Sequence, residues 1–354
     1  NEEATETEIV GLVQELQDAV KRCDDLVPTY FEAAMLLAWC FYRDRKADIA
    51  VLEVGLGGRL DATNVCHPNV CVITSISLDH TNVLGDTLQA IAGEKAGIIK
   101  SSVPVVCGVT DEPARSVIHA RAAENKCELI QLGDDVTFHY SPPTELGVPA
   151  TVDVNTPQGD WRDVSVPLAG EHQGNNLAVA IAAFDQLMQN GWQLDQEAAI
   201  SALPNVRLPG RVEVLSRDPL VIVDAAHNEA SMRALVRSLG ELSDGRPRVA
   251  IFATTKQKDA AGMLRHLLPT FDEIVLTQYL HNPRAIPWSD LFELAKQIRE
   301  ELSLSVDLHT APTPAEAWEV GSKLVIGESG LICTTGSFFI AAEMRSLLKG
   351  EAAQ

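Results

Sequence analysis

The sequence has 354 residues, 46% of them hydrophobic, and 28 basic against 49 acidic residues give a formal net charge of −21. This length and apolar content predict two domains with ample cores, and the negative charge argues against a nucleic-acid or anionic-membrane surface. Seven scattered cysteines without CxxC spacing and the lack of a membrane-length apolar run favour a soluble protein of the reducing cytoplasm, with neither a disulfide framework nor a zinc site.

The first predicted elements are helical. The chain opens on Asn1 with the acidic stretch NEEATETEIV, which reads like the interior of a protein, so we expect an N-terminal truncation. A helix is predicted from Thr29 to Phe41, because Thr29-x-x-Glu32 has the form of a capping box. A second helix is predicted from Leu88 to Ile99.

Short apolar runs rich in β-branched residues alternate with these helical patterns. They predict strands at residues 47–54, 70–76, 103–109, 220–226, 248–255, 273–279 and 330–336. Because such continuous runs are typical of strands buried on both faces, we expect α/β architecture with mostly parallel sheets.

Two other regions depart from this alternation. Residues 133–170 carry the proline, glycine and alternating pattern of antiparallel hairpins and predict a β-excursion within the first domain. A helix is expected at residues 176–190. The proline-rich stretch LPNVRLPGR at 203–211 then predicts an irregular connection at the domain boundary.

The stretch VLEVGLGGRLDATN places Glu53 near the end of the first apolar run, with Gly55, Gly57 and Gly58 directly after it. Asp79 and His80 follow the second run. Ligands bind beyond the carboxyl ends of parallel strands, so a carboxylate and an imidazole there could share one magnesium ion. The alternatives are a buried acid satisfied by backbone N–H groups for Glu53 and a structural hydrogen bond for His80.

The phosphate-binding motifs are incomplete. Leu60 stands where a G-x-G-x-x-G fingerprint needs its third glycine, and the sequence contains no G-x-x-x-x-G-K-[ST]. Lys95 could be an ordinary surface charge, and Arg211 an ordinary salt-bridge residue near an interdomain cleft. Asp224 precedes His227 and Asn228 after an apolar run, and it could equally be the N-cap of the next helix.

Six motifs together resemble the folylpolyglutamate synthase and dihydrofolate synthase family of the Mur ligase superfamily, in the same order and at similar intervals over about residues 28 to 340. They are LEVGLGGRLDATN, TSISLDHTNVLGDTLQAIAGEKAGIIK, GEHQGNN, LPGR, VIVDAAHN and TTGSF. The resemblance implies an ATP- and magnesium-dependent ligase that phosphorylates the carboxylate of dihydropteroate or a folate. The amino group of L-glutamate then attacks the acyl phosphate to form an amide.

The resemblance also implies a domain plan and a set of site residues. Residues 1–212 would form a Mur-ligase-type ATP-binding domain, incomplete at its start, and residues 213–354 a smaller Rossmann-like glutamate-ligase domain. The expected roles are magnesium ligands (Glu53, His80), a carbamylated lysine (Lys95), a pterin-pocket wall (Leu60, Asp61, Ala62), nucleotide contacts (Asn176, Arg211, Asp224) and a histidine near the ATP and glutamate pockets (His227). Lys95, Arg211 and His227 are the expected catalytic residues.

Several departures from the family pattern leave alternatives open. The family's P-loop would lie upstream of Asn1, so we expect the chain as written not to turn over alone. Glu229 replaces a usual proline and Leu177 a usual alanine. An NAD(P)-dependent oxidoreductase built on the Gly55–Gly58 turn, a non-catalytic relic of the fold and another Mur-type amino-acid ligase are the competing hypotheses. The family is typically monomeric, and the sequence does not distinguish dihydropteroate from folate as acceptor.

Overall fold

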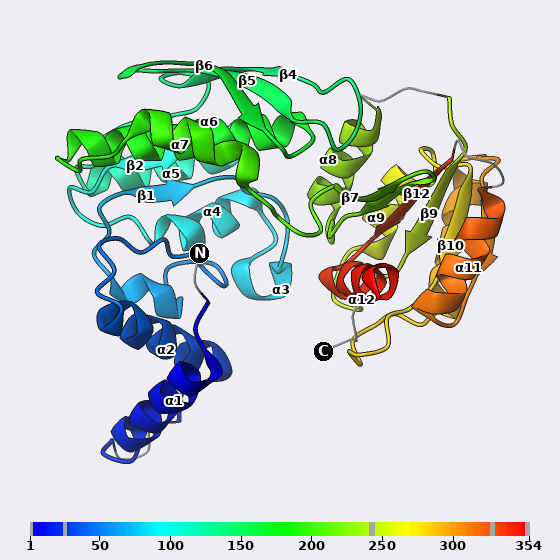
Figure 1. Ribbon diagram of the computed structural model, residues 1–354, viewed down its shortest axis with the longest axis horizontal. Helices are drawn as coiled ribbons and strands as arrows, with labels where there is room; N and C mark the ends of the chain where they lie inside the picture. The colour runs from blue at the N-terminus through cyan, green and yellow to red at the C-terminus, as the bar shows by residue number, and fades with distance from the viewer. Residues whose placement is uncertain (1–2, 24–26, 241–244, 326–329, 351–354) are drawn as a thin grey trace. The chain divides into compact units, whose positions relative to one another are not determined.

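The computed structural model describes residues 3–23, 27–240, 245–325 and 330–350 (Figure 1). Its contacts divide the chain into two compact units, one of residues 1–76 with 81–129 and one of residues 77–80 with 130–354. Strands and helices alternate along both units, which confirms the predicted α/β class. The predicted boundary after residue 212 separates two family domains, whereas the two units above are defined by their internal contacts. The boundary therefore stays a prediction.

The first unit is built around short parallel strands covered by helices. Its three-stranded sheet has the order β1–β2–β3, and β1 and β2 pair in parallel with Cys71 opposite Val105. Both strands lie within predicted runs. The elements are α1 (Glu6–Val20), α2 (Tyr30–Asp44), η1 (Ala62–Val65), β1 (Cys71–Ile73), α3 (Thr81–Leu84), α4 (Leu88–Ala96), β2 (Val105–Cys107), α5 (Glu112–Glu124) and β3 (Leu129–Gln131), where the unit ends.

The predicted strand at residues 47–54 is wrong. The run is irregular, and within the described part of the chain no strand pairs with it. Val51 is 90% exposed, and Glu53 is exposed as well, so the alternative in which Glu53 is a buried acid is also wrong. An apolar run needs hydrogen-bonded neighbours to form a strand, because isolated extended backbone leaves its polar groups to water.

The structure contains the two helices that were predicted in the first unit. Thr29 caps α2 with its side chain accepting from the Glu32 N–H, while the Glu32 carboxylate accepts from the Thr29 N–H at 2.8 Å. This reciprocal pair is the predicted capping box. The helix predicted from Leu88 to Ile99 is α4, which ends three residues earlier than expected, at Ala96.

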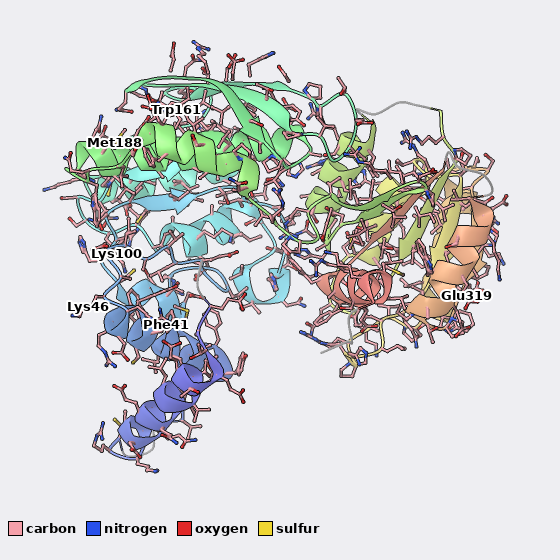
Figure 2. The ribbon with its side chains drawn as sticks, in the orientation of Figure 1. Phe41, Lys46, Lys100, Trp161, Met188 and Glu319 are labelled. Carbon is pink, nitrogen blue, oxygen red and sulfur yellow. The ribbon has the colours of Figure 1, made fainter. Side chains whose placement is uncertain are left out.

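The second unit begins with the predicted β-excursion, an antiparallel sheet of β4 (Thr137–Ser141), β5 (Ala150–Thr156) and β6 (Gly159–Val166). The buried Trp161 of β6 lies on the side of this sheet that faces α6 (Glu171–Gln189), edge-on to Phe184 at 5.6 Å (Figure 2). Helix α6 starts five residues before the predicted position. Gly170 precedes it with a φ of +103°, a left-handed turn that glycine adopts readily.

A six-stranded sheet forms the rest of this unit, in the order β11–β10–β9–β12–β8–β7, parallel except for the edge strand β7. The predicted runs at 220–226, 248–255, 273–279 and 330–336 all contain strands of this sheet. The elements are α7 (Gln196–Ala202), η2 (Leu203–Asn205), β7 (Glu213–Arg217), β8 (Leu220–Val223), α8 (Glu229–Gly240), β9 (Arg248–Phe252), α9 (Ala260–Leu267), β10 (Glu273–Leu276), α10 (Trp288–Glu301), β11 (Asp307–Thr310), α11 (Pro314–Leu324), β12 (Leu331–Thr335) and α12 (Phe338–Lys349).

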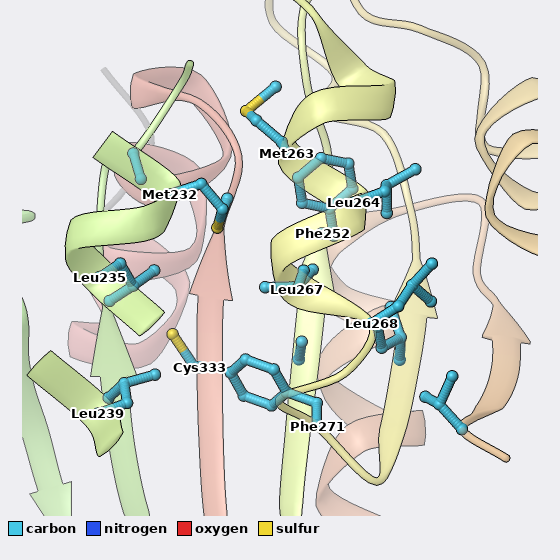
Figure 3. Packing of buried hydrophobic residues seen from close by; sticks show 14 of the residues in the cluster. Met232, Leu235, Leu239, Phe252, Met263, Leu264, Leu267, Leu268, Phe271 and Cys333 are labelled. Atoms are coloured by element: carbon cyan, nitrogen blue, oxygen red, sulfur yellow. The ribbon is translucent and has the colours of Figure 1, made fainter. Parts of the chain in front are cut away.

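Both faces of this sheet are buried, as the continuous apolar runs predict. Along β9, Phe252 packs with α8, α9 and α10, whereas its neighbour Ile251 packs with α11 and α12. Figure 3 shows the core around Phe252, with Met232, Leu264 and Cys333 turned into it. Alternate residues of each strand therefore serve opposite cores. Across the described residues, no helix is long and apolar enough to cross a membrane.

Candidate active site

Asp224 follows β8 directly and is buried at the carboxyl end of the sheet. Its two oxygens accept the N–H groups of Val212 and Ala226, each at 2.8 Å. It is therefore not the N-cap of α8, which begins five residues later. Burial raises the pKa of the Asp224 carboxyl, against the opposing effect of the two N–H donors and of the charge on Arg211.

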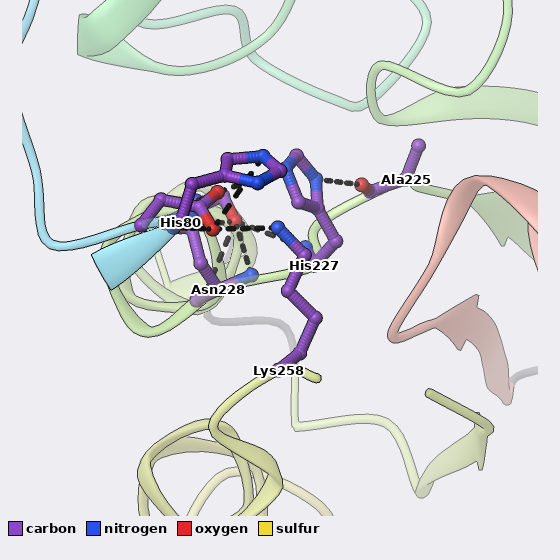
Figure 4. A network of polar contacts seen from close by, with 7 residues as sticks. His80, Ala225, His227, Asn228 and Lys258 are labelled. Carbon is purple, nitrogen blue, oxygen red and sulfur yellow. Dashed lines mark hydrogen bonds and ion pairs between the residues drawn. The ribbon is translucent and has the colours of Figure 1, made fainter. Parts of the chain in front are cut away.

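A second carboxylate, Asp79, lies in the same unit and is the centre of a polar network (Figure 4). Lys258 donates to Oδ1 at 2.6 Å and Asn228 donates to Oδ2 at 2.9 Å, while His227 Nε2 lies 3.5 Å from Oδ2. Burial alone would raise the pKa of Asp79, but these hydrogen bonds and the Lys258 charge hold it well below its ordinary value.

His227 is oriented by contacts on both sides of its ring. Nδ1 lies 3.0 Å from the Ala225 carbonyl oxygen, and the ring lies 5.0 Å from that of Phe338, the first residue of α12. Nε2 faces Asp79 Oδ2, so the ring lies between two acceptors and can donate to both only when both of its nitrogens carry a proton.

Arg211 reaches the same residues from the irregular connection. Its guanidinium stacks over the Phe338 ring at 5.0 Å. Burial, followed by the charge of Arg211, lowers the pKa of His172 at the start of α6. A chain of contacts continues along α6, since His172 Nε2 lies 3.1 Å from the Gln173 amide and Gln173 accepts from the exposed Asn176 at 3.1 Å.

His80 is held in an uncommon conformation beside Asp79. Its φ is +51°, in the left-handed region that few non-glycine residues adopt, and its N–H donates to Asp79 Oδ1 at 2.7 Å. The side chain is 50% exposed, with Nε2 3.8 Å from Asp79 Oδ1. Part of the His80 side chain is therefore accessible to solvent.

In the first unit, the glycine-rich turn packs on the end of α4. The position of a Cβ at Gly58 would lie 3.0 Å from the carbonyl oxygens of both Glu94 and Lys95, and Gly57 has a φ of +69°. The glycines thus let the turn approach the helix closely. Arg59 fixes the contact, donating to both Glu94 carboxylate oxygens at 3.1 to 3.2 Å.

The predicted pterin-wall residues follow this turn. Asp61 accepts from the Leu56 N–H at 2.9 Å and from the Thr63 N–H at 3.0 Å, so it closes the turn and caps η1. These hydrogen bonds lower the pKa of Asp61 although burial opposes them. Leu60 projects outward with 81% exposure, and Ala62 is half-buried. Leu60 is thus an apolar side chain available to a ligand rather than to the core.

Lys95 lies in the last turn of α4 and is half-buried. Among the described residues, its ammonium has no carboxylate partner. Glu53 and Lys95 belong to the first unit and His80 to the second, so the magnesium pair of Glu53 and His80 stays a prediction. No group of three or more His, Cys, Asp or Glu side chains that could hold a metal occurs among the described residues.

The structure therefore brings together His80 and His227 around Asp79, and Arg211 and Asp224 beside them, within the second unit. Sequence reasoning missed Lys258 as a member of this cluster, and it quoted Phe338 only as the end of the TTGSF motif without giving it a role. Both follow the carboxyl end of a parallel strand, β9 and β12 respectively, which is the signal that could have identified them.

Two family models match the chain. The Mur ligase middle domain matches residues 6–184, and the Mur ligase glutamate ligase domain matches residues 210–338. The folylpolyglutamate synthase of Lacticaseibacillus casei is 32% identical over 330 residues, which cover 92% of this chain and 73% of that protein.

Solved structures agree with this similarity. Mycobacterium tuberculosis folylpolyglutamate synthase complexed with ADP aligns with a TM-score of 0.86 and 31% identity, covering 98% of this chain and 79% of that one. The bifunctional folylpolyglutamate synthase/dihydrofolate synthase of Yersinia pestis, complexed with AMPPNP and a Mn ion, aligns with a TM-score of 0.81 and 30% identity, covering 98% and 77%.

Proposed function

Because the chain belongs to the folylpolyglutamate synthase and dihydrofolate synthase family of Mur ligases, we propose that it joins L-glutamate to a folate or to dihydropteroate at the expense of ATP. The observation that carries the proposal is the cluster at the strand ends of the second unit, where Arg211, His227 and Lys258 gather cationic and imidazole groups in a chain of net charge −21. Family membership does not favour the oxidoreductase alternative.

The domain plan follows from the same membership. Residues 1–212 serve as the ATP-binding domain and residues 213–354 as the glutamate-ligase domain, with the proline-rich connection at 203–211 near the boundary. Arg211 at the end of this connection, together with Asn176 and Asp224, contacts the nucleotide. Arg211 is suited to the role because a planar guanidinium binds phosphate oxygens in pairs and stacks on an aromatic ring at the same time.

A divalent metal ion fits the donor set. Glu53 offers an exposed carboxylate, the hard oxygen ligand that magnesium prefers, and the half-exposed ring of His80 offers a nitrogen. Two protein ligands are enough, since magnesium commonly completes its shell with phosphate oxygens and water. When bound, the ion supplies charge neutralisation at the phosphate oxygens.

The remaining residues position the reactants. His227 is held between the Ala225 carbonyl oxygen and the Asp79 carboxylate, and it lies near the ATP and glutamate pockets, where the ammonium of glutamate must lose a proton before its nitrogen can attack. Leu60, Asp61 and Ala62 form the wall against the pterin ring. Addition of CO₂ to Lys95 Nζ, with loss of two protons from the ammonium, converts the cation to a carbamate anion, whose negative charge suits a position near the proposed magnesium ion.

The test uses the full-length gene product with ATP, magnesium and L-glutamate. We expect ADP release that requires both glutamate and either dihydropteroate or a reduced folate, with an amide product seen by mass spectrometry. Glu53→Ala should abolish it, while the exposed acid on α5 replaced in Glu124→Ala should not. ADP release without an acceptor, or full activity of Glu53→Ala, would contradict the proposal.

Two further parts of the proposal have separate tests. Activity that rises with bicarbonate, and a peptide containing Lys95 that is 44 Da heavier under native digestion, would support carbamylation. If both changes were absent, carbamylation would be ruled out. We also propose a cytoplasmic monomer that acts on small molecules and binds no nucleic acid. Light scattering at the mass of one chain, which is 38.3 kDa for these 354 residues, would support the monomer, and twice the mass of one chain would contradict it.

A further inference from the structure

The turn that carries Arg211 has an unusual backbone. Val212 has a φ of +46°, and a β-branched residue in the left-handed region is a genuine outlier. Gly210, two residues before it, has a φ of +70°. Such a conformation persists only where surrounding contacts determine it, so the contacts around residues 208–213 are the relevant ones.

Two carboxylates hold this turn by its backbone. Asp224 accepts from the Val212 N–H at 2.8 Å, and Glu213 Oε2 accepts from the Gly210 N–H at 2.9 Å. The Gly210 carbonyl in turn accepts from the Ala225 N–H at 2.8 Å. Arg211 is therefore flanked on both sides by residues whose amides are fixed by a charged acceptor.

Glu213 is itself held by the last helix. Arg345 Nε lies 3.0 and 3.1 Å from its two oxygens, and Lys349 Nζ lies 3.2 Å from Oε1. The pair is shielded, with side-chain exposures of 18% for Glu213 and 28% for Arg345. The hydrogen bonds from Gly210, Arg345 and Lys349 lower the pKa of Glu213 although burial opposes them.

The same helix contacts the Arg211 guanidinium at its other end. Phe338 is the first residue of α12, and its ring lies beneath Arg211 and beside His227, each at 5.0 Å. Helix α12 thus sets the backbone of the Arg211 turn through Arg345 and sets the Arg211 side chain through Phe338. The same helix therefore contacts both the turn that carries the Arg211 backbone and the Arg211 guanidinium.

We propose that the Glu213–Arg345 ion pair is a positioning pair for Arg211, which fixes the turn 208–213 so that the guanidinium meets the nucleotide. This inference rests on the proposed function, in which Arg211 contacts ATP. Glu213 and Arg345 touch no reactant in it. They act through the Gly210 amide, so their loss should weaken nucleotide binding and leave the acceptor's binding unchanged.

Four variants test the pair in the full-length gene product. Glu213→Ala and Arg345→Met should weaken ADP binding about tenfold and raise KM for ATP similarly, with KM for the folate acceptor within about twofold. Glu213→Gln keeps an acceptor for the Gly210 amide and should fall between. Arg345→Lys keeps the charge and should recover most of the affinity. Hydrogen exchange at residues 208–213 should quicken in the same order.

The matched control is Arg265→Met, which removes another arginine–carboxylate pair of this unit, to Glu301 at 2.7 Å. It should leave ADP affinity and exchange at residues 208–213 unchanged. Folded Glu213→Ala and Arg345→Met proteins that bind ADP like the wild type would overturn the inference. If the wild type bound no ADP, the proposed function would fail. In that case the hydrogen exchange of residues 208–213 alone would decide on the positioning role, and unchanged exchange in the variants would overturn it.

Discussion

Residues 47–54 and 220–226 are both apolar runs that end near a carboxylate, yet they adopt different structures. The second run forms β8, which pairs with β12 and β7, and its Asp224 is buried with both oxygens occupied by backbone N–H groups. The first run is irregular, with Val51 and Glu53 exposed. Composition alone therefore does not make a strand or a buried acid.

The difference lies in the neighbours. Each residue of β8 finds a parallel partner on β12, such as Ile222 opposite Cys333, and helices cover both faces of that sheet. The run at 47–54 has no partner strand in the described part of the chain. Hydrogen-bonded neighbouring strands, rather than hydrophobicity, decide whether such a run forms a strand that is buried from water.

The largest expected effect tests packing. Ile222→Ala removes a fully buried side chain from the core and should lower the free energy of unfolding by about 4 kcal/mol. Val51→Ala, in the exposed run, should change it by less than about 0.5 kcal/mol. Urea unfolding followed by circular dichroism measures both. Equal losses would show that the two runs are packed alike and would refute the comparison.

The two carboxylates come next. Asp224→Ala leaves the Val212 and Ala226 N–H groups buried without an acceptor and should cost about 3 kcal/mol. Glu53→Ala should be neutral in stability, within about 0.5 kcal/mol, because the side chain is exposed. Thermal unfolding of both variants, without ligands, checks this. A strongly destabilised Glu53→Ala protein would mean that Glu53 has a structural partner.

A smaller effect is expected where charges are paired at the strand ends. Lys258→Met leaves Asp79 without its cation and should lower stability by about 2 kcal/mol, less than for a fully buried pair because both side chains keep 15 to 19% exposure. The control Lys21→Met removes a pair to Asp18 that is more than half exposed, and urea unfolding should detect no change. A neutral Lys258→Met would show that water replaces this lysine without cost.

The smallest effect is a pH dependence at Asp224. Burial raises its pKa above the ordinary value of 3.8, so the stability it contributes is present at low pH and is lost as pH rises through the folded pKa. Asn cannot ionise. The stability of the wild type relative to Asp224→Asn should therefore fall as pH increases from about 4, as measured by urea midpoints at several pH values. A flat difference would contradict the raised pKa.

Much of the fold followed from local patterns. The capping box at Thr29, the antiparallel region at 133–170 and four strands of the large sheet were predictable, because periodicity, turn residues and caps act over a few neighbouring residues. The strand at 47–54 was mispredicted since its pairing depends on residues distant in sequence. The start of α6 was missed because Gly170, rather than a polar cap, sets it.

The candidate site shows the same limit. Arg211, Asp224 and His227 carry motifs that could be found in the sequence, and the structure places them together. Lys258 and the Glu213–Arg345 pair carry no motif, and although Lys258 follows a strand end, the contacts of these residues join positions more than 130 residues apart along the chain. Only the folded chain shows that Lys258 donates a hydrogen bond to an aspartate so far away in sequence.

The order of the six-stranded sheet has a consequence for synthesis on the ribosome. Strand β12, the last of this sheet's strands along the chain, lies between β8 and β9 rather than at an edge. A nascent chain that ends before Leu331 would hold two half-sheets with open inner edges, which invite pairing with other chains. A premature stop codon shortly before that residue should therefore yield an aggregating, rapidly degraded product rather than a merely weakened enzyme.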